Sequence, residues 1–467
     1  MKLIFSAAFL FLITAISCKK QGTQVDKNAA STVGLDEDQN TFVSEKAYQE
    51  KTRPRTVSPE TIFTYDGKTV RVKAYSRDVG ENNVTVFKYG DLINRAIAYK
   101  TAHPSTTVTI RFAMYQVSNL AYIGFDPSHS SYGYVKGNDF GGDHSEKLIW
   151  SIVKAAKNEV YIDFVYHKDK SGDAYDYISQ FLNDPCYTNA AKKVTDYLKI
   201  RQIGWGESGG QQMHAKFMTV SHYAGNSGGG VLNTVYCTSA NVDSHDSNGI
   251  PSPNYVQSGI LINGHPELMA SYNQYFDLIY NNHTDQTAFR TAVRAAHSTN
   301  SLNYDDYHFS SYFYPIPTTF ASNAWDTSFN PVAKYVSQMA AAPNKYMKAN
   351  VYYLGADFGK TLYDSLYAIY HAPGTGIRDF KFVVADTHTG GDSILSKFNN
   401  IGIIKYPKHT HSKDVLFAFS KFYTITGSAN LTRGEYTIKA NTNVVVKEYT
   451  AAHPVYNSFK AIYSYQY

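Results

Sequence analysis

The chain has 467 residues, of which 43% are hydrophobic, and this apolar content excludes wholesale disorder. The length is enough for two or three ordinary domains or for one large duplicated domain. A formal net charge of +5 is compatible with an anionic substrate, but it is too small to indicate a nucleic-acid-binding protein by itself.

The N-terminus has the composition of a signal peptide over residues 1–17, with an apolar run between Lys2 and Cys18. The ending Ala15-Ile-Ser-Cys18 resembles a bacterial lipobox, in which the cysteine is lipidated, and ordinary cleavage and release is the alternative. Residues 18–59 are polar and charged, which is typical of a flexible tether. We therefore expect an exported protein, either an outer-membrane or periplasmic lipoprotein or a secreted protein, with a lipid anchor at Cys18 in the first case.

Strand-like and helix-like patterns alternate from about residue 60. Runs of β-branched and aromatic residues predict strands, and apolar residues at helical spacing predict helices. In chain order, the first half has predicted strands at 108–115, 160–166, 199–203, 212–220, 235–241 and 255–262, and predicted helices at 146–157, 190–198 and 266–280. Such alternation implies βαβ units and a sheet covered on both faces.

The second half repeats this order of elements. Its predicted strands are at 347–354, 380–385, 401–405, 415–419, 423–430 and 443–447, and its predicted helices are at 332–341, 360–370, 393–398 and 454–463. The pairs His265-Pro266 and His453-Pro454 open the last helix of each half. These agreements indicate an internal repeat, with one half at 60–300 and the other at 301–467.

A His-x-Lys motif precedes an apolar strand in each half. His214 and Lys216 form the first copy, and His411 and Lys413 form the second. Because successive side chains of a strand alternate between its faces, the histidine and lysine of each copy point the same way and can bind one ligand. Each copy is followed by a strand that ends in Ser-x-Asn, namely Ser239-Ala-Asn241 and Ser428-Ala-Asn430.

A single His-x-Lys arises readily by chance, but two copies with the same downstream motif do not. Together they resemble the phospholipase D superfamily, whose members carry two such motifs, and the resemblance spans about residues 60–467. It implies an α/β fold of two similar α/β/α sandwich halves, related by a pseudo-two-fold axis, with both motifs at one active site. Two ammonium groups and two imidazoles suit the cleavage of an anionic phosphodiester, with no metal or other cofactor.

The resemblance also implies a role for each motif residue. His214 resembles the nucleophile that forms a phosphohistidine and His411 the general acid, although the two roles could be exchanged. The resemblance implies that the phosphate is bound by Lys216, Lys413, Asn241 and Asn430. It implies that these phosphate-binding residues are supported by Ser239 and Ser428. Gln257 and Asn443 stand near where the family often has a glutamate that orients a catalytic histidine.

The sequence departs from the family pattern at three positions. The family usually has Asp five residues after the motif lysine, where this chain has Ser221 and Ala418. Thr238 replaces the glycine of the first Gly-Ser-x-Asn. The aspartate is commonly a supporting residue, so we expect a divergent branch that retains the chemistry.

We therefore expect a monomeric phosphodiesterase acting on phospholipid head groups at a membrane. An endonuclease of the same superfamily, with nucleic acid as its partner, and a catalytically silent phosphate-binding envelope protein are the alternatives. Metal ligation by His409 with His411, or by residues around Asp143 and Asp243, is disfavoured because no plausible ligand set is complete. A disulfide between Cys186 and Cys237 is left open.

Overall fold

A computed structural model describes residues 60–77, 84–117, 148–168, 174–206, 212–225, 229–242, 257–299, 301–317, 324–386, 391–405 and 410–466. The expected signal peptide, the tether and Cys18 lie outside these ranges. So do His409, Asp143 and Asp243. Within the described ranges, no helix is both long and apolar enough to cross a membrane.

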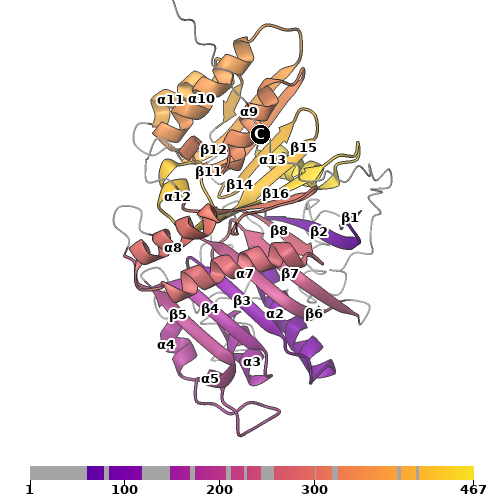
Figure 1. Ribbon diagram of the computed structural model, residues 1–467, viewed down its shortest axis with the longest axis vertical. Coiled ribbons are helices and arrows are strands. Elements are labelled where there is room, and N and C mark those ends of the chain that lie inside the picture. The colour runs from indigo at the N-terminus through magenta and orange to yellow at the C-terminus, as the bar shows by residue number, and fades with distance from the viewer. Residues whose placement is uncertain are drawn as a thin grey trace, which may run out of the picture.

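The first half is built on an eight-stranded mixed sheet with the order β1-β2-β8-β7-β6-β3-β4-β5 (Figure 1). Only β3, β4 and β5 pair in parallel, and the other neighbours are antiparallel. The strands are β1 (Thr61–Tyr65), β2 (Lys68–Arg77), β3 (Thr109–Met114), β4 (Tyr161–His167), β5 (Leu198–Ile203), β6 (Lys216–Ala224), β7 (Gly230–Thr238) and β8 (Gln257–Asn263).

The second half repeats this sheet strand for strand, in the order β13-β12-β11-β14-β15-β16-β10-β9. Parallel and antiparallel pairs fall at the same places, so β6 corresponds to β14, β7 to β15 and β8 to β16. The strands are β9 (Tyr304–Asp305), β10 (Phe309–Tyr314), β11 (Lys345–Tyr353), β12 (Arg378–Asp386), β13 (Ile403–Lys405), β14 (Lys413–Ala418), β15 (Phe422–Gly427) and β16 (Asn441–Glu448). The predicted class, a duplicated α/β protein, is confirmed.

Helices cover both faces of each sheet. The first half contributes α2 (Val84–Ala102), α3 (Leu148–Lys157), α4 (Ala174–Ser179), α5 (Val194–Tyr197), α7 (Pro266–Asn281) and α8 (Gln286–Ser298). The second contributes α9 (Pro331–Ala340), α10 (Ala356–His371), α11 (Gly391–Phe398), α12 (Arg433–Thr437) and α13 (Pro454–Gln466). Both helices expected after a His-Pro pair begin at that proline, because proline suits the first helical turn and lacks an N–H that would need a partner there.

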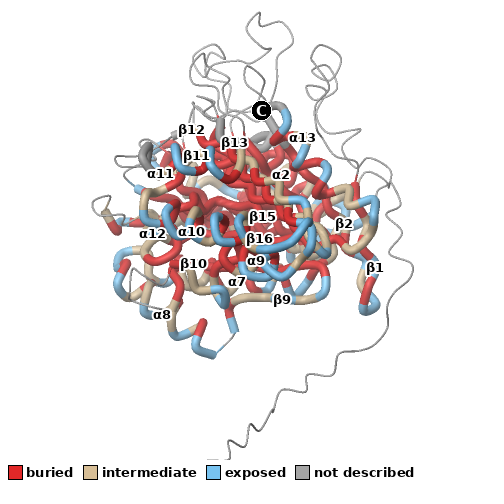
Figure 2. The backbone as a smooth tube through the Cα atoms, turned by 90° about the horizontal axis from the view of Figure 1, so that it is seen from above, coloured by how far each residue is buried: buried red, intermediate tan, exposed pale blue. Residues whose placement is uncertain are grey.

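One hydrophobic core is shared by the two halves. It joins residues of α7 and the first sheet, such as Phe217 and Tyr275, to residues of the second sheet and α13, such as Val444 and Phe459. Each sheet has one further core on its outer face. This core lies under α2 and α3 in the first half and under α9 and α10 in the second. Seen from above, buried residues gather in the interior of the molecule, and most exposed ones lie toward its edge (Figure 2). The sheets are therefore packed as one body, which fixes the relative position of the two motifs.

The helix expected at 190–198 is wrong in extent. Only Val194–Tyr197 is helical, because Leu198 already pairs with Ile162 as the first residue of β5. The chain before α5 forms turns, with Val194 N donating to Asp184 O. The pattern of apolar residues did not separate a single helical turn from the strand that follows it without a break.

Candidate functional site

The two His-x-Lys motifs sit at equivalent strand starts. Lys216 is the first residue of β6 and Lys413 the first of β14, and each histidine lies two residues earlier. In each motif the lysine Nζ donates to the backbone carbonyl of its own histidine, at 3.0 Å in the first copy and 2.6 Å in the second. All four residues are buried, the lysines almost completely and His214 and His411 with 7% and 9% exposure.

The first motif is tied directly to the second half. His214 N donates to Ala440 O at 2.8 Å, and Ala440 N donates to Gln212 O at 3.1 Å. These bonds form a short parallel bridge just before β16. The backbone that carries His214 is therefore positioned by the strand that begins at Asn441.

The side chain of His214 is held by two residues of the second half. Its Nδ1 lies 3.0 Å from Asn441 Oδ1 and 3.2 Å from Glu435 Oε2. Asn441 Nδ2 donates to the same Glu435 oxygen at 2.6 Å, which turns the amide oxygen toward the ring. Because a carboxylate and an amide oxygen only accept, Nδ1 carries the hydrogen and Nε2 carries the lone pair.

His411 is held in the reciprocal way by the first half. Its Nδ1 lies 3.1 Å from Gln257 Oε1, and Ser239 Oγ donates to that oxygen at 2.7 Å. Ser428 Oγ donates to Asn441 Oδ1 at 3.0 Å in the other copy. In each copy, the serine of the Ser-x-Asn motif donates to the side-chain amide oxygen that contacts the histidine, and so orients that amide. Because the amide oxygen of Gln257 only accepts, His411 also carries its hydrogen on Nδ1, as His214 does.

The charges of both motifs act on one another. The pKa of His411 is held well below its usual value, first by burial and then by the charges of Lys413, Lys216 and His214. Burial lowers the pKa of His214 to about 4, with Lys216 lowering it further and Glu435 opposing both. Both imidazoles are therefore neutral at pH 7 in the protein alone, and the motifs of both halves converge on one site.

The Asn residues of the Ser-x-Asn motifs each follow the strand that lies beside the His-x-Lys strand of the same half. Asn241 follows β7 and Asn430 follows β15, and both are buried. Asn430 Nδ2 lies 3.4 Å from Glu435 Oε1, and within the described part of the chain Asn430 Oδ1 has no hydrogen-bond partner. A buried amide with unused hydrogen-bonding capacity suits a residue that meets a ligand.

Asn443 does not take the place that the sequence analysis expected. Its Oδ1 accepts from Tyr314 Oη at 3.0 Å, and its Nδ2 donates to Thr426 O at 3.5 Å. The amide beside His214 is Asn441, two residues earlier on β16. Because residues two apart on a strand share a face, the sequence did not distinguish them.

Two tyrosines flank the histidines symmetrically. Tyr115 follows β3 and meets the His214 ring edge-on, with centroids 5.0 Å apart, and Tyr352 on β11 meets His411 at 4.7 Å. Each tyrosine ring also lies near the lysine of the same copy. Lys216 Nζ is 5.0 Å from the Tyr115 centroid, and Lys413 Nζ is 5.7 Å from the Tyr352 centroid. Aromatic contact with both groups restricts their movement and helps to exclude water.

The positions where the family has aspartate lie away from the histidines. Ser221 is five residues beyond Lys216 on β6, roughly 16 Å along an extended strand. Its Oγ accepts from Thr109 N at 2.9 Å. Ala418 ends β14 and pairs with Tyr346. Loss of these carboxylates therefore does not remove a group that contacts the histidines.

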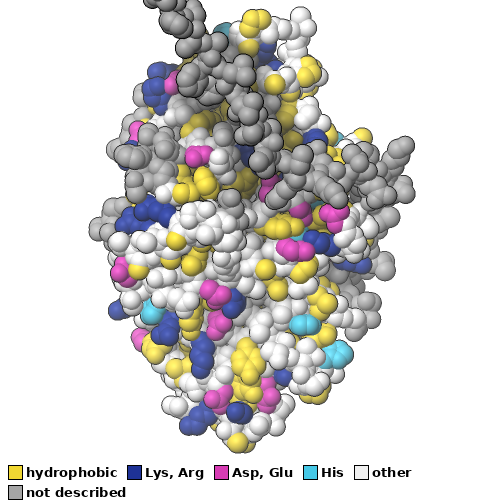
Figure 3. All heavy atoms as spheres, in the orientation of Figure 1, with side chains coloured by type: hydrophobic (Ala, Val, Ile, Leu, Met, Phe, Trp, Pro, Cys, Tyr) yellow, Lys and Arg dark blue, Asp and Glu magenta, His cyan; other side chains and the backbone are white. Residues whose placement is uncertain are grey.

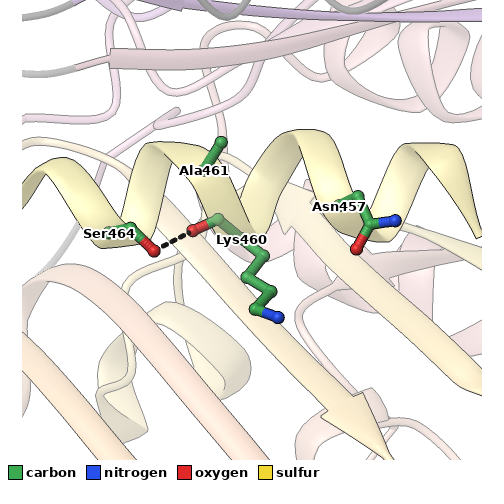
Figure 4. Close-up of a pocket in the computed structure, with 4 residues that line it drawn as sticks. All are labelled: Asn457, Lys460, Ala461 and Ser464. Atoms are coloured by element: carbon green, nitrogen blue, oxygen red, sulfur yellow. Dashed lines mark hydrogen bonds between the residues drawn. The ribbon is translucent and has the colours of Figure 1, made fainter.

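No group of three or more His, Cys, Asp or Glu side chains suited to a metal ion occurs among the described residues. Cys186 and Cys237 are buried free thiols, which decides the question of a disulfide between them. A cavity of about 510 Å³ lies against α13 and is lined, among described residues, by Asn457, Lys460, Ala461 and Ser464 (Figure 4). None of these four belongs to the motifs, and Ser464 Oγ is used within the helix by donating to Lys460 O.

No family model matches the sequence, and no curated protein matches it. Similar solved structures include phosphatidylserine synthase from Haemophilus influenzae Rd KW20, at 10% identity and a TM-score of 0.48, covering 90% of this chain and 89% of that one. Polyphosphate kinase from Porphyromonas gingivalis has 10% identity and a TM-score of 0.45, covering 85% of this chain and 50% of that one. The phospholipase D family member Nuc from Salmonella typhimurium has 15% identity and a TM-score of 0.24, covering 34% of this chain and 92% of that one.

The chain spans only half the length of the polyphosphate kinase chain. At these identities and TM-scores, the activity must be argued from the residues of the site.

Proposed function

We propose that this protein is a phosphodiesterase of phospholipase D type that acts through a phosphohistidine. The observation that carries the proposal is the reciprocal arrangement of His214 and His411. Each ring is held at Nδ1 by an amide oxygen of the opposite half, which places the hydrogen on Nδ1. Two imidazoles presented in this way supply a nucleophile and a proton carrier at one site.

The reaction has two steps. In the first, Nε2 of one histidine forms a bond to phosphorus while the phosphorus–oxygen bond to the leaving alcohol breaks, and the other histidine donates a proton to the departing oxygen. In the second, that histidine takes a proton from water as the water oxygen bonds to phosphorus. The nitrogen–phosphorus bond breaks and its electron pair returns to the first histidine.

The buried lysines provide the charge that a phosphodiester anion needs. Lys216 and Lys413 are almost fully buried, so their attraction for an anion is weakly screened. In the protein without a ligand, burial and then these positive charges hold the pKa of His411 well below its usual value. A bound anion offsets them and raises that pKa, so the proton donor is charged when substrate is present.

Phospholipid head groups are the substrate we propose first, because the N-terminal sequence predicts an exported protein anchored at Cys18 or released. A nuclease requires a basic groove along the nucleic acid backbone. On the face drawn in Figure 3, basic and acidic side chains are interspersed over the surface. Nucleic acid is therefore the second candidate.

Purified full-length protein should be assayed on labelled phosphatidylcholine, phosphatidylethanolamine and single-stranded DNA, with a chelator present throughout. We expect head-group release from at least one lipid and none from the His214→Asn variant. Hydrolysis of DNA alone would identify a nuclease. A wild-type protein that binds phosphate analogues but turns over no substrate would identify a silent binding protein.

A further inference from the structure

The two halves differ in charge at one pair of equivalent strand positions. Arg111 on β3 lies beside Asp163 on β4, and the same positions on β11 and β12 carry Lys348 and Lys381. The positions are equivalent because Arg111 and Lys348 each lie three residues before the residue that pairs with the motif lysine of their half. A pair of opposite charges in the first half is therefore a pair of like charges in the second.

The cation of the first half is balanced by carboxylates. Arg111 Nη1 lies 2.9 Å from Asp277 Oδ2 on α7, and Arg111 Nε lies 3.9 Å from Asp163 Oδ2. The guanidinium also lies over the ring of Phe276 on α7, 5.6 Å from its centroid. One positive charge thus has two carboxylates around it, which leaves no demand for a further anion.

The equivalent place in the second half has more lysines than carboxylates among the described residues. Lys348 and Lys381 share Asp379, with Nζ to Oδ2 distances of 4.0 Å and 3.1 Å. Helix α13 adds Tyr463, whose ring centroid is 5.2 Å from Lys348 Nζ, and a third lysine, Lys460. Burial and then the charge of Lys381 lower the pKa of Lys348, Asp379 opposes them, and Lys460 lowers it further. Like charges side by side on neighbouring strands are unfavourable, so this cluster is suited to an added anion.

A cavity of about 510 Å³ gives access to one of these lysines. Lys460 lines it together with Asn457 and Ser464, and all three residues are exposed. Lys460 and Asn457 extend from the same side of α13 (Figure 4). Within the described part of the chain, no carboxylate forms an ion pair with Lys460 Nζ. The volume lies in the range of small-molecule sites, about 300–1,000 Å³, so it has room for a phosphate and the group that carries it.

This lysine cluster is separate from the histidine motifs. Lys348 and Tyr352 lie four residues apart on one face of β11, roughly 13 Å along the strand. Tyr352 is the ring that contacts His411. One phosphate group cannot contact both places at that separation, so an anion at the lysine cluster is additional to one held between the histidines.

We propose that Lys348, Lys381 and Lys460 form a second anion site, which binds a phosphate monoester group. Such a group carries about −1.5 to −2 charges at pH 7, which offsets the excess of lysines, and lysine binds phosphate as a point charge. The group belongs either to a soluble phosphorylated compound or to a lipid head group. The site does not depend on the proposed function, because none of its residues belongs to the motifs.

Calorimetric titration of full-length protein with inorganic phosphate tests the site in solution. Lys460→Gln should weaken one class of phosphate site by about 10-fold or more and leave kcat on a soluble phosphodiester unchanged. Lys397→Gln is the matched control, since it removes the same charge from an exposed position on α11, which packs on the outer core. The control should bind phosphate as the wild type does.

A second variant copies the arrangement of the first half. Lys381→Asp places a carboxylate beside Lys348, as Asp163 stands beside Arg111. It should abolish phosphate binding at the cluster, and thermal melting checks that the protein remains folded. Crystals soaked in tungstate, whose anomalous signal locates the ion, should show it between the three lysines in the wild type and not in Lys381→Asp.

The outcomes separate this site from the proposed activity. If both variants bind phosphate as the wild type does, the proposal is overturned, and tungstate at the lysines would then be an adventitious ion only. If the wild type cleaves no phosphodiester but loses phosphate binding in both variants, the proposed function is overturned and the site stands.

Sedimentation with vesicles identifies the source of the phosphate. Vesicles of phosphatidylcholine are compared with vesicles that also contain phosphatidic acid, whose head group is a phosphate monoester. Binding to the second kind that Lys460→Gln weakens would support a lipid head group as the ligand. Equal sedimentation of Lys460→Gln and wild type, with phosphate binding lost in solution, would support a soluble phosphorylated compound.

Discussion

Nδ1 of His214 lies 3.0 Å from Oδ1 of Asn441, a residue 227 positions further along the chain. The contact orients the first histidine through the second half of the protein, and the contact of His411 with Gln257 does the reverse over 154 positions. Neither half alone holds its own histidine in this way. The site therefore exists only when the two sheets are packed together.

Asn441 and Asn443 provide a matched pair of substitutions. Both lie on β16, but only Asn441 contacts His214, while Asn443 bonds Tyr314. We expect Asn441→Ala to lower kcat by about 10- to 100-fold, because the ring loses one acceptor and Glu435 loses a donor. Asn443→Ala should keep most of the activity. Steady-state assays on one phosphodiester decide between them, and equal losses in both variants would contradict the geometry.

The pH profile should report the low pKa of the first histidine. Burial lowers the pKa of His214 to about 4, and the nucleophile must be neutral. For a p-nitrophenyl phosphodiester, whose leaving group needs no proton, kcat/KM should therefore fall only below about pH 5. An ordinary histidine would give a midpoint near pH 6.5. A midpoint at that higher value would contradict a buried nucleophile.

Asp414 should give a pH-dependent stability. Burial raises the pKa of this carboxyl to about 7, although hydrogen bonds from Thr426 and Ser258 lower it in part. Between about pH 4 and pH 7 the folded protein holds a proton that the unfolded chain has released, so this group stabilises the fold at low pH and loses that contribution as pH rises to 7.

Asparagine cannot ionise, so Asp414→Asn should gain stability relative to wild type across that window. The gain is up to about 1.4 kcal/mol per pH unit, and it should level off above pH 7. Urea unfolding of both proteins at several pH values measures it. A difference that stays constant from pH 4 to pH 8 would show that Asp414 is ionised throughout.

The backbone conformation at residue 427 requires glycine. It has φ of +148°, and a Cβ atom there would lie 2.3 Å from Thr442 O. We expect Gly427→Ala to destabilise the protein by about 1–3 kcal/mol or more, because the φ value and the close approach both oppose a side chain. Gly434→Ala is the control, since a Cβ there meets nothing within 4 Å and the residue is helical. Equal stability of the two variants would be inconsistent with the turn before Ser428.

The fold and the motif residues could be predicted because the same order of elements and the same motifs occur in both halves of the sequence. His214 with Lys216 and His411 with Lys413 recur before equivalent strands, and helices begin at Pro266 and Pro454 as the repeated His-Pro pairs indicated. Repetition distinguished these residues from the other histidines and lysines of the chain.

The residues that hold the histidines could not all be predicted, because they are set by packing between the halves. Glu435 lies on a short helix outside both the His-x-Lys and the Ser-x-Asn motifs, so the motif pattern gave no signal for it. Asn441 and Asn443 share a strand face, and only the register between β15 and β16 decides which one meets His214.

The central claim is that His214 forms a bond to phosphorus. It is tested most directly by mixing the His411→Ala variant with a p-nitrophenyl phosphodiester, quenching in alkali and mapping the adduct by mass spectrometry. The first step needs no general acid with this leaving group, whereas the second lacks its base, so the intermediate should accumulate. We predict one phosphoryl group on the peptide that contains His214 and a matching burst of p-nitrophenolate. An adduct on another residue, or a His214→Asn variant that retains wild-type turnover, would contradict the mechanism.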